Sequence, residues 1–316
     1  MTRRVLMFPG QGSQAIGMGK MLATSFAEAK AVFEEVDETL KQRLSDLMFE
    51  GNIEALTDTR NAQPALMAVS VAVIRVLEKQ AGMALSELTS YVAGHSLGEY
   101  SALCSAGAIT LSDTARLLRI RGKAMQEAVP QGQGGMVALV GTDHTIAEAI
   151  TREASQAGVC QIANDNGGGQ VVVSGDMAAM DQIVLLASKY GIKRALKLPV
   201  SAPFHSTLME PARIVMQEAL AGTAIVAPSV PVIANITADE ITDPVVIRSL
   251  LVEQVTGMVR WRESIHALKN KGVTQAVECG AGKVLAGLVK RIEPEIETCS
   301  LQEPADIDAF LTKIKG

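Results

Sequence analysis

The residues in this sequence with the clearest capacity for chemistry stand at 94–98, Gly-His-Ser-Leu-Gly. They fit G-x-S-x-G, the pattern of a nucleophile elbow, in which a tight turn joins a strand to a helix. Apolar residues 91–93 precede the pattern, and residues 99–106 after it have helical character. In that setting the glycines let strand and helix approach closely, and the hydroxyl of Ser96 is exposed beside N–H groups that can stabilise an oxyanion. The sequence therefore predicts nucleophilic catalysis through an ester at Ser96.

A serine nucleophile needs a base, and the chain offers four histidines. Histidine is the usual base because its pKa lies near neutrality. His144 falls in a polar turn and His266 in mid-helix, which is typical of surface or packing roles, and the ring of His95 is expected to point away from Ser96. His205 stands in the loop 201–206, and loops often carry catalytic residues. By elimination, His205 is the predicted base.

The segments before residue 131 and after residue 198 share one pattern, in which short apolar strands alternate with helices. Strands are expected at residues 5–8, 91–93, 232–235 and 273–278, and helices at residues 25–47, 64–79, 99–106, 111–129, 209–221, 245–255, 261–271 and 283–291. Pro64 is expected at the start of its helix. Such alternation favours a mainly parallel sheet with helices on both faces.

Residues 131–198 follow a different pattern. Strands are expected at 136–140, 159–163, 170–174 and 193–198, helices at 145–157 and 177–190, and a turn at 164–169. This βαββαβ order is the split-βαβ arrangement of ferredoxin-like domains. We therefore expect an α/β protein with two parts, a catalytic domain from residues 1–130 and 199–316 and an inserted ferredoxin-like subdomain at residues 131–198.

Composition limits the class of protein. A net charge of -5 gives no global indication of binding to nucleic acid or to an anionic membrane. No stretch approaches the roughly 20 apolar residues of a membrane helix, and the N-terminal apolar run is too short for a signal peptide. The four cysteines lack metal-ligand spacing, so buried reduced thiols are expected and no metal site is. These features predict a cytoplasmic protein.

Four separated segments resemble the malonyl-CoA:acyl-carrier-protein transacylase family and the acyltransferase domains of fatty-acid and polyketide synthases. They are residues 8–14 (Phe-Pro-Gly-Gln-Gly-Ser-Gln), 94–99 (Gly-His-Ser-Leu-Gly-Glu), 119–122 (Arg-Ile-Arg-Gly) and 203–206 (Pro-Phe-His-Ser). Their order and spacing extend the resemblance along essentially the whole chain. It implies an α/β-hydrolase-like core with the ferredoxin-like insertion.

The resemblance implies a role for each residue that matches a catalytic position of the family. Ser96 matches the nucleophile, and His205 matches the base that later acts as an acid. The backbone N–H groups of Gln11 and Leu97 match the oxyanion hole. The main-chain carbonyl of Gln254 matches the group that orients the histidine, in place of the acid of a Ser-His-Asp triad.

Three further residues are implied to contact the substrate. Arg121 matches the arginine that holds the malonyl carboxylate, for which a guanidinium fork is well suited. Phe204 matches a bulky aromatic that accompanies malonyl preference by filling the space an α-methyl group needs. Asn166 is expected at the mouth of the cleft, in the turn 164–169.

The implied reaction is ping-pong transfer of malonyl from malonyl-CoA to the phosphopantetheine thiol of acyl carrier protein, for fatty-acid synthesis. Coenzyme A enters only as part of the substrate, and no cofactor or metal and a monomeric state are expected. Alternatives are an acyltransferase of a polyketide or malonate decarboxylase system, a serine esterase or thioesterase, and an inactive carrier-binding module. Arg121 has no purpose in a simple lipase, and the presence of both Ser96 and His205 argues against an inactive module.

Overall fold

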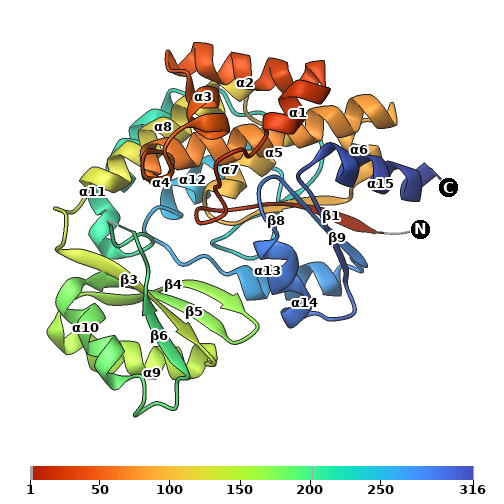
Figure 1. The fold of residues 1–316 in the computed structure, drawn as a ribbon. Coiled ribbons are helices and arrows are strands. Elements are labelled where there is room, and N and C mark those ends of the chain that lie inside the picture. Colours follow the sequence, from red (N-terminus) through yellow and green to blue (C-terminus); the bar gives the residue numbers. More distant parts are fainter. Residues whose placement is uncertain (1–2, 201, 316) are drawn as a thin grey trace.

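The computed structural model describes residues 3–200 and 202–315, which form a mixed α/β fold with two separate sheets (Figure 1). Among these residues the larger sheet has six strands in the order β10-β9-β1-β2-β7-β8. Neighbouring strands are parallel except for the antiparallel pair β7–β8. The strands are β1 (Arg4–Phe8), β2 (Tyr91–Gly94), β7 (Val232–Ile233), β8 (Glu240–Ile241), β9 (Gln275–Cys279) and β10 (Glu297–Leu301). The expected mainly parallel sheet is confirmed.

Helices cover both faces of this sheet, which explains why β1 is a continuous apolar run. Leu6 and Phe8 face the core under α2, α5 and α8, whereas Val5 and Met7 face α13 and α14. The helices of this part are α1 (Lys20–Ser25), α2 (Ala27–Leu40), α3 (Leu44–Glu50), α4 (Ile53–Thr57), α5 (Thr59–Ala81), α6 (Leu85–Leu88), α7 (Leu97–Ser105), α8 (Leu111–Glu127), α11 (Glu210–Ala221), α12 (Pro244–Glu253), α13 (Trp261–Asn270), α14 (Val284–Ile292) and α15 (Pro304–Lys315). Helix α5 is buried along most of its length, so its alanines and valines let α2, α7 and α8 pack closely around it.

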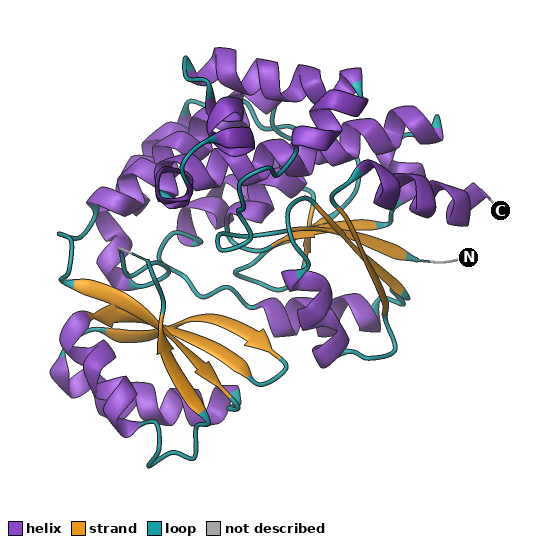
Figure 2. Cartoon of the chain, viewed as in Figure 1, coloured by secondary structure: helices purple, strands orange, loops and turns teal. Residues whose placement is uncertain are grey.

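The smaller sheet is antiparallel, with the strand order β4-β5-β3-β6 (Figure 2). Its strands are β3 (Gly134–Val140), β4 (Cys160–Gly167), β5 (Gln170–Asp176) and β6 (Arg194–Lys197). Helices α9 (His144–Ala154) and α10 (Met177–Leu186) pack on one face and enclose a separate apolar core. The opposite face looks toward the larger unit.

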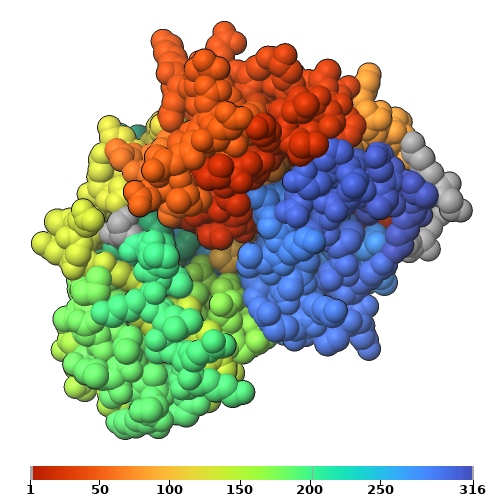
Figure 3. Space-filling view, in the orientation of Figure 1, coloured from red at the N-terminus to blue at the C-terminus, as the bar shows by residue number. Residues whose placement is uncertain are grey.

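Strand β4 joins the two units. The N–H of Asp165 donates to the carbonyl of Val259 at 3.0 Å, and the N–H of Val259 donates to the carbonyl of Ala163 at 2.8 Å. The buried carboxylate of Asp165 also pairs with Arg262 of α13 at 2.8 Å. These contacts fix the smaller unit (green in Figure 3) against the C-terminal part of the larger one (blue).

Several expected elements differ from the structure. Residues 25–47 do not form one helix, because Phe26 is extended and Lys41 adopts a left-handed conformation, with φ 49°. Pro64 lies inside α5 and does not begin it. The helix starts earlier because the side chain of Asp58 accepts the N–H of Arg60 and caps the first turn.

The turn expected at residues 164–169 is also shorter than predicted. Strand β4 continues through Gly167, with Asn164 paired to Val172 and Asp165 to Val171. Two register shifts, typical of β-bulges, let this polar run stay in the ladder. The short strand β8, the edge strand β10 and the C-terminal helix α15 were not expected.

The cysteines are free thiols in the structure, and Cys104, Cys160 and Cys279 are buried. Cys299 is half-buried. Within residues 3–200 and 202–315, no helix combines the length and the apolar character needed to cross a membrane.

Candidate active site

Ser96 lies in the turn between β2 and α7, as the elbow pattern predicts. Its backbone is strained, with φ 54° and ψ -111°. The flanking glycines make the turn possible. A Cβ on Gly94 would come within 1.9 Å of the Gly98 backbone, and one on Gly98 within 2.2 Å of the carbonyl oxygen of Phe8. Neither position can therefore hold a side chain without displacing the backbone beside it.

Two side chains from other elements hold this turn. Asn235, which follows β7, accepts the N–H of Ser96 on its Oδ1 at 2.7 Å and donates from Nδ2 to the carbonyl of Gly94 at 2.7 Å. Gln254, directly after α12, donates from Nε2 to the carbonyl of Ser96 at 3.0 Å. The peptide groups on both sides of the serine are thus hydrogen-bonded, which stabilises the strained conformation.

His205 lies beside the serine, with Nε2 2.7 Å from Ser96 Oγ. Its Nδ1 lies 2.9 Å from the carbonyl oxygen of Gln254 and 3.0 Å from that of Gly257. Because carbonyl oxygens only accept, Nδ1 carries the proton and Nε2 is free to accept the serine proton. His205 is thus placed to act as a base toward Ser96. Main-chain carbonyl oxygens orient its ring, in the position that a carboxylate occupies in a Ser-His-Asp triad.

The environment keeps this imidazole neutral. Burial lowers the pKa of His205 to about 3, and the charges of Arg121 and His95 act in the same direction. The hydrogen bonds to the carbonyls of Gln254 and Gly257 oppose the shift but do not reverse it. A neutral histidine is the form that can take a proton from the serine.

Arg121 reaches the serine from α8, and its side chain is fully buried. Nη1 donates to Gln63 Oε1 at 2.8 Å, and Nη2 donates to Gln254 Oε1 at 2.8 Å and to Ser96 Oγ at 3.1 Å. The guanidinium lies 5.6 Å from the ring centre of Tyr100. Two amide oxygens and an aromatic face therefore fix a cation next to the nucleophile.

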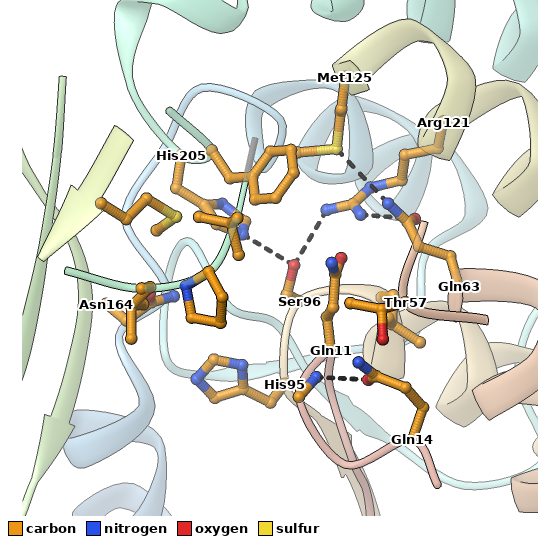
Figure 4. Close-up of a pocket in the computed structure, with 17 residues that line it drawn as sticks. Gln11, Gln14, Thr57, Gln63, His95, Ser96, Arg121, Met125, Asn164 and His205 are labelled. Atoms are coloured by element: carbon orange, nitrogen blue, oxygen red, sulfur yellow. Dashed lines mark hydrogen bonds between the residues drawn. The ribbon is translucent and has the colours of Figure 1, made fainter. Parts of the chain in front are cut away.

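These groups open into a cavity of about 230 Å³ between the two sheets (Figure 4). Its described lining includes Gln11, Leu97, Met125, Leu198 and Phe204. Among the described residues that line it, Arg121 alone carries a permanent charge. The cavity is therefore suited to a small group that is apolar in part and carries an anion.

The loops after β1 and β2 lie side by side, because Phe8 pairs with Gly94 in the parallel register. Gln11 and Leu97 are thereby brought to the same end of the cavity as Ser96. Leu97 is the first residue of α7, and the first N–H groups of a helix have no partner within it. Its N–H group is therefore available to an oxyanion formed at Ser96.

From the sequence, the ring of His95 is expected to point away from Ser96, and Asn166 is expected at the mouth of the cleft. In the structure the two side chains contact each other. His95 Nε2 lies 2.8 Å from Asn166 Oδ1, and the ring of His95 is directed away from Ser96 in Figure 4. Asn166 is buried and is not among the described residues that line the cavity, whereas Asn164 is. Because β4 continues past residue 164, Asn166 lies within the strand and contacts His95.

Three polar residues of the site were not singled out from the sequence: Gln63, Asn235 and Glu99. Asn235 follows a strand of a parallel sheet, and residues at the carboxyl ends of such strands commonly form ligand sites, so its position could have drawn attention. Gln63 is a polar side chain in an otherwise apolar, buried stretch of α5. Glu99 stands within the elbow segment, but nothing in that pattern shows what it contacts.

Comparison with known proteins gives a consistent result. The family model described as "Acyl transferase domain" matches residues 5–300. The chain is 44% identical over 316 residues to the malonyl CoA-acyl carrier protein transacylase of Bacillus subtilis (strain 168), covering 100% of this chain and 98% of that protein.

Solved structures agree with this. An acyl-carrier-protein-S-malonyltransferase from Bartonella henselae superposes with a TM-score of 0.97 at 53% identity, covering 99% of this chain and 100% of that one. A malonyl-transacylase in complex with its type II PKS acyl-carrier protein superposes with a TM-score of 0.95 at 38% identity, covering 99% and 100%.

Proposed function

This chain belongs to the acyl transferase family and, within it, to the malonyl-CoA–acyl carrier protein transacylases, and we propose that the residues around Ser96 perform the reaction. The enzyme moves a malonyl group from malonyl-CoA to acyl carrier protein and so supplies fatty-acid synthesis. The observation that carries our assignment of the site is the buried Arg121, whose Nη2 lies 3.1 Å from Ser96 Oγ. A fixed cation at that distance is suited to hold the free carboxylate of a malonyl group whose thioester carbonyl meets the serine.

In the first half-reaction His205 Nε2 takes the proton of Ser96 Oγ, and Oγ attacks the thioester carbonyl carbon. The N–H groups of Leu97 and Gln11 stabilise the oxyanion. The carbon–sulfur bond then breaks, and the coenzyme A sulfur leaves with the proton from His205. The product is a malonyl ester on Ser96.

The second half-reaction reverses the roles. The phosphopantetheine thiol of the carrier protein gives its proton to His205 Nε2, and the sulfur attacks the ester carbonyl. The carbon–oxygen bond breaks, and Ser96 Oγ recovers the proton. Throughout, the carbonyls of Gln254 and Gly257 accept from Nδ1–H, so the imidazole keeps one orientation in both steps.

We assign the selectivity for malonyl to two residues of the cavity. Arg121 binds the carboxylate, and its neighbours Gln63 and Gln254 hold the guanidinium in place before the substrate arrives. Phe204 is buried next to His205 in the cavity wall and fills space beside the acyl α-carbon. A serine esterase with the same nucleophile and base has no use for such a buried cation, so hydrolysis is the less favoured activity.

Loading followed by transfer tests this function. Intact-mass measurement after mixing with malonyl-CoA should show one added malonyl group, and holo acyl carrier protein should then remove it and gain the same mass. A serine esterase would instead release free malonate without carrier protein. That result, with no malonyl carrier protein formed, would overturn the proposed transfer.

The first prediction concerns Arg121. Leaving one partner of a buried charge pair alone destabilises a complex by roughly 2–5 kcal/mol, which is about 30-fold to a few thousandfold in kcat/KM. Arg121→Ala should lower kcat/KM for malonyl-CoA by that factor, whereas acetyl-CoA, which has no carboxylate, should lose far less. Arg121→Lys should keep only part of the kcat/KM for malonyl-CoA, because a lysine side chain lacks the planar fork of the guanidinium.

The matched control for this experiment is Arg116→Ala. Arg116 lies on the same helix, but it is exposed and pairs with Asp113 at 2.9 Å, so both substrates should keep their rates. An equal loss for malonyl-CoA and acetyl-CoA in Arg121→Ala would make the arginine a structural residue.

The second prediction concerns pH. Since the pKa of His205 is lowered to about 3, the base stays neutral far below the range of an ordinary histidine. An unperturbed histidine with pKa near 6.5 would lose about tenfold in its neutral fraction at about pH 5.5. The rate of Ser96 acylation by malonyl-CoA, followed by intact mass, should instead be nearly the same at about pH 5.5 and 7.5. An acidic limb with its midpoint near 6.5 would contradict the neutral buried base.

The finer description of the fold is also our proposal. We infer that residues 1–130 and 199–316 form an α/β-hydrolase-like catalytic domain and that residues 131–198 form an inserted ferredoxin-like subdomain. The element order β3-α9-β4-β5-α10-β6 and the strand order β4-β5-β3-β6 support this. We further expect a monomer that works in the cytoplasm without a metal or cofactor, coenzyme A entering only with the substrate.

A further inference from the structure

Glu99 is a buried acid on α7, three residues after the nucleophile, that the reaction described above does not use. Its side chain is 1% exposed, and Glu99 is not among the described residues that line the cavity. Oε2 accepts the Nε2–H of Gln254 at 2.7 Å and the backbone N–H of Asn235 at 3.1 Å. Its hydrogen bonds to the site therefore run through these two neighbours, and its charge also acts on Arg121.

The contact with Glu99 sets which way the side-chain amide of Gln254 points, together with the bond from the same Nε2 to the Ser96 carbonyl at 3.0 Å. A carboxyl oxygen at 2.7 Å requires the –NH₂ end of the amide, so the Oε1 end must face the other way. That end accepts Nη2–H of Arg121 at 2.8 Å. A reversed amide would put two N–H donors against each other at Arg121 and two acceptors against each other at Glu99.

We propose that Glu99 is a positioning residue that orients the Gln254 amide, and through it aims Arg121 at the malonyl carboxylate. Gln63 fixes only Nη1 of the guanidinium, whereas Gln254 fixes Nη2, the nitrogen that also contacts Ser96 Oγ. The inference rests on the proposed function, since it gives Glu99 a part in the selectivity for malonyl over acyl groups without a carboxylate.

The contact between Gln254 and His205 does not depend on the Gln254 side chain. The carbonyl that accepts from His205 Nδ1 belongs to the main chain, which is held by the bond from Gln254 N–H to the Leu250 carbonyl at 2.9 Å. Loss of Glu99 should thus disturb the carboxylate site and leave the orientation of the histidine unchanged.

The protonation state of Glu99 does not alter this argument. Burial raises the pKa of Glu99 to about 7, so both forms exist near neutrality. Oε1 has no hydrogen-bond partner among the described residues and can carry the proton. Oε2 then remains an acceptor for Gln254 in either form.

The test compares kcat/KM for malonyl-CoA and acetyl-CoA in variants that differ in the acceptor at position 99. Glu99→Ala and the isosteric Glu99→Met lack the acceptor and should lower the malonyl-to-acetyl ratio about 10- to 100-fold. Glu99→Gln offers its own Oε1 to Gln254 and should restore most of the ratio. In a Gln254→Ala background, Glu99→Ala should change the ratio little further, because the side chain it acts through is already gone.

The matched control is Glu278→Ala. Glu278 is equally buried, and one of its oxygens likewise has no partner among the described residues, but it accepts a backbone N–H at the start of α14 and lies outside the cavity. Its loss should lower the unfolding temperature and leave the ratio unchanged.

Two results would overturn the inference. In the first, a folded Glu99→Ala or Glu99→Met protein keeps the wild-type malonyl-to-acetyl ratio. In the second, Glu99→Ala lowers that ratio by the same factor in the wild-type and Gln254→Ala backgrounds. If the wild-type enzyme itself did not discriminate malonyl-CoA from acetyl-CoA, the proposed function would be contradicted. That outcome is distinct from failure of the Glu99 inference, in which the wild type discriminates and the Glu99 variants do so equally well.

Discussion

Replacing Ser96 by alanine is expected to reduce malonyl transfer by about 10⁴- to 10⁶-fold, because the covalent route through the serine ester is lost and only binding and oxyanion stabilisation remain. The fold should persist, since alanine has the same backbone strain as serine at φ 54° and the bonds from Asn235 and Gln254 reach the peptide groups, not the hydroxyl. Steady-state transfer from malonyl-CoA to acyl carrier protein gives the rate, and intact mass shows whether any malonyl adduct forms.

The structure supplies a matched control for this experiment. Ser101 lies on α7, the helix that follows Ser96, and is fully buried, and its hydroxyl has no hydrogen-bond partner among the described residues. Ser101→Ala removes the same atom type, a hydroxyl oxygen, five residues further along the chain and should keep both the label and the rate. Stoichiometric labelling of the Ser96→Ala protein by malonyl-CoA would show that another residue is the nucleophile.

Removing the imidazole of His205 is expected to slow acylation by roughly 10²- to 10⁴-fold, the usual contribution of a general base. Without Nε2 at 2.7 Å, none of the described residues bonded to Ser96 Oγ accepts its proton. Arg121, the other side chain bonded to that oxygen, can only donate. The measurement is the rate of malonyl-Ser96 formation in a single turnover, which separates acylation from transfer to the carrier protein.

The backbone at this position affects the choice of variant. His205 has φ 57°, a left-handed conformation that asparagine tolerates better than alanine. His205→Asn should therefore fold at least as well as His205→Ala while lacking the base. His266→Ala is the surface control, because that ring, on α13, pairs with Glu293 directly after α14 and lies outside the cavity. If His95→Ala stopped acylation while His205→Asn did not, the base would be His95.

These experiments depend on a buried polar network whose members come from distant parts of the chain. Glu99 and Gln254 are 155 positions apart, and Ser96 and Asn235 are 139 apart. The elbow pattern singled out Ser96 and the family resemblance singled out Gln254, but neither Asn235 nor a role for Glu99 was predicted. Asn235 and Gln63 are single polar residues in apolar surroundings, and such residues are as common in structural roles as in sites.

The case of Asn166 shows a second limit. Residues 164–169 consist of turn formers, which predicts a loop, and the family resemblance implies that this loop lies at the cleft. In the structure the ladder with β5 continues through this stretch by means of two register shifts, and Asn166 bonds to His95 from within strand β4. Local preference for a turn was overridden by pairing with a neighbouring strand, an outcome that depends on tertiary context.

The sequence by itself determined what is local or periodic in this protein. The G-x-S-x-G pattern at 94–98, between an apolar run and a helical stretch, predicts a strand–turn–helix that exposes Ser96. The apolar runs and their alternation with helices predict a parallel sheet, because these features depend on sterics and burial within a few residues. Only the tertiary structure decided which side chains meet at the serine. The order β1-β2-β7 brings Gln11, Ser96 and Asn235 to one edge of the sheet, and the packing of α5, α8 and α12 around it aims Gln63, Arg121 and Gln254 at one point. Hydrogen bonds are short and directional, so these contacts depend on the relative positions of whole elements, which no local pattern encodes.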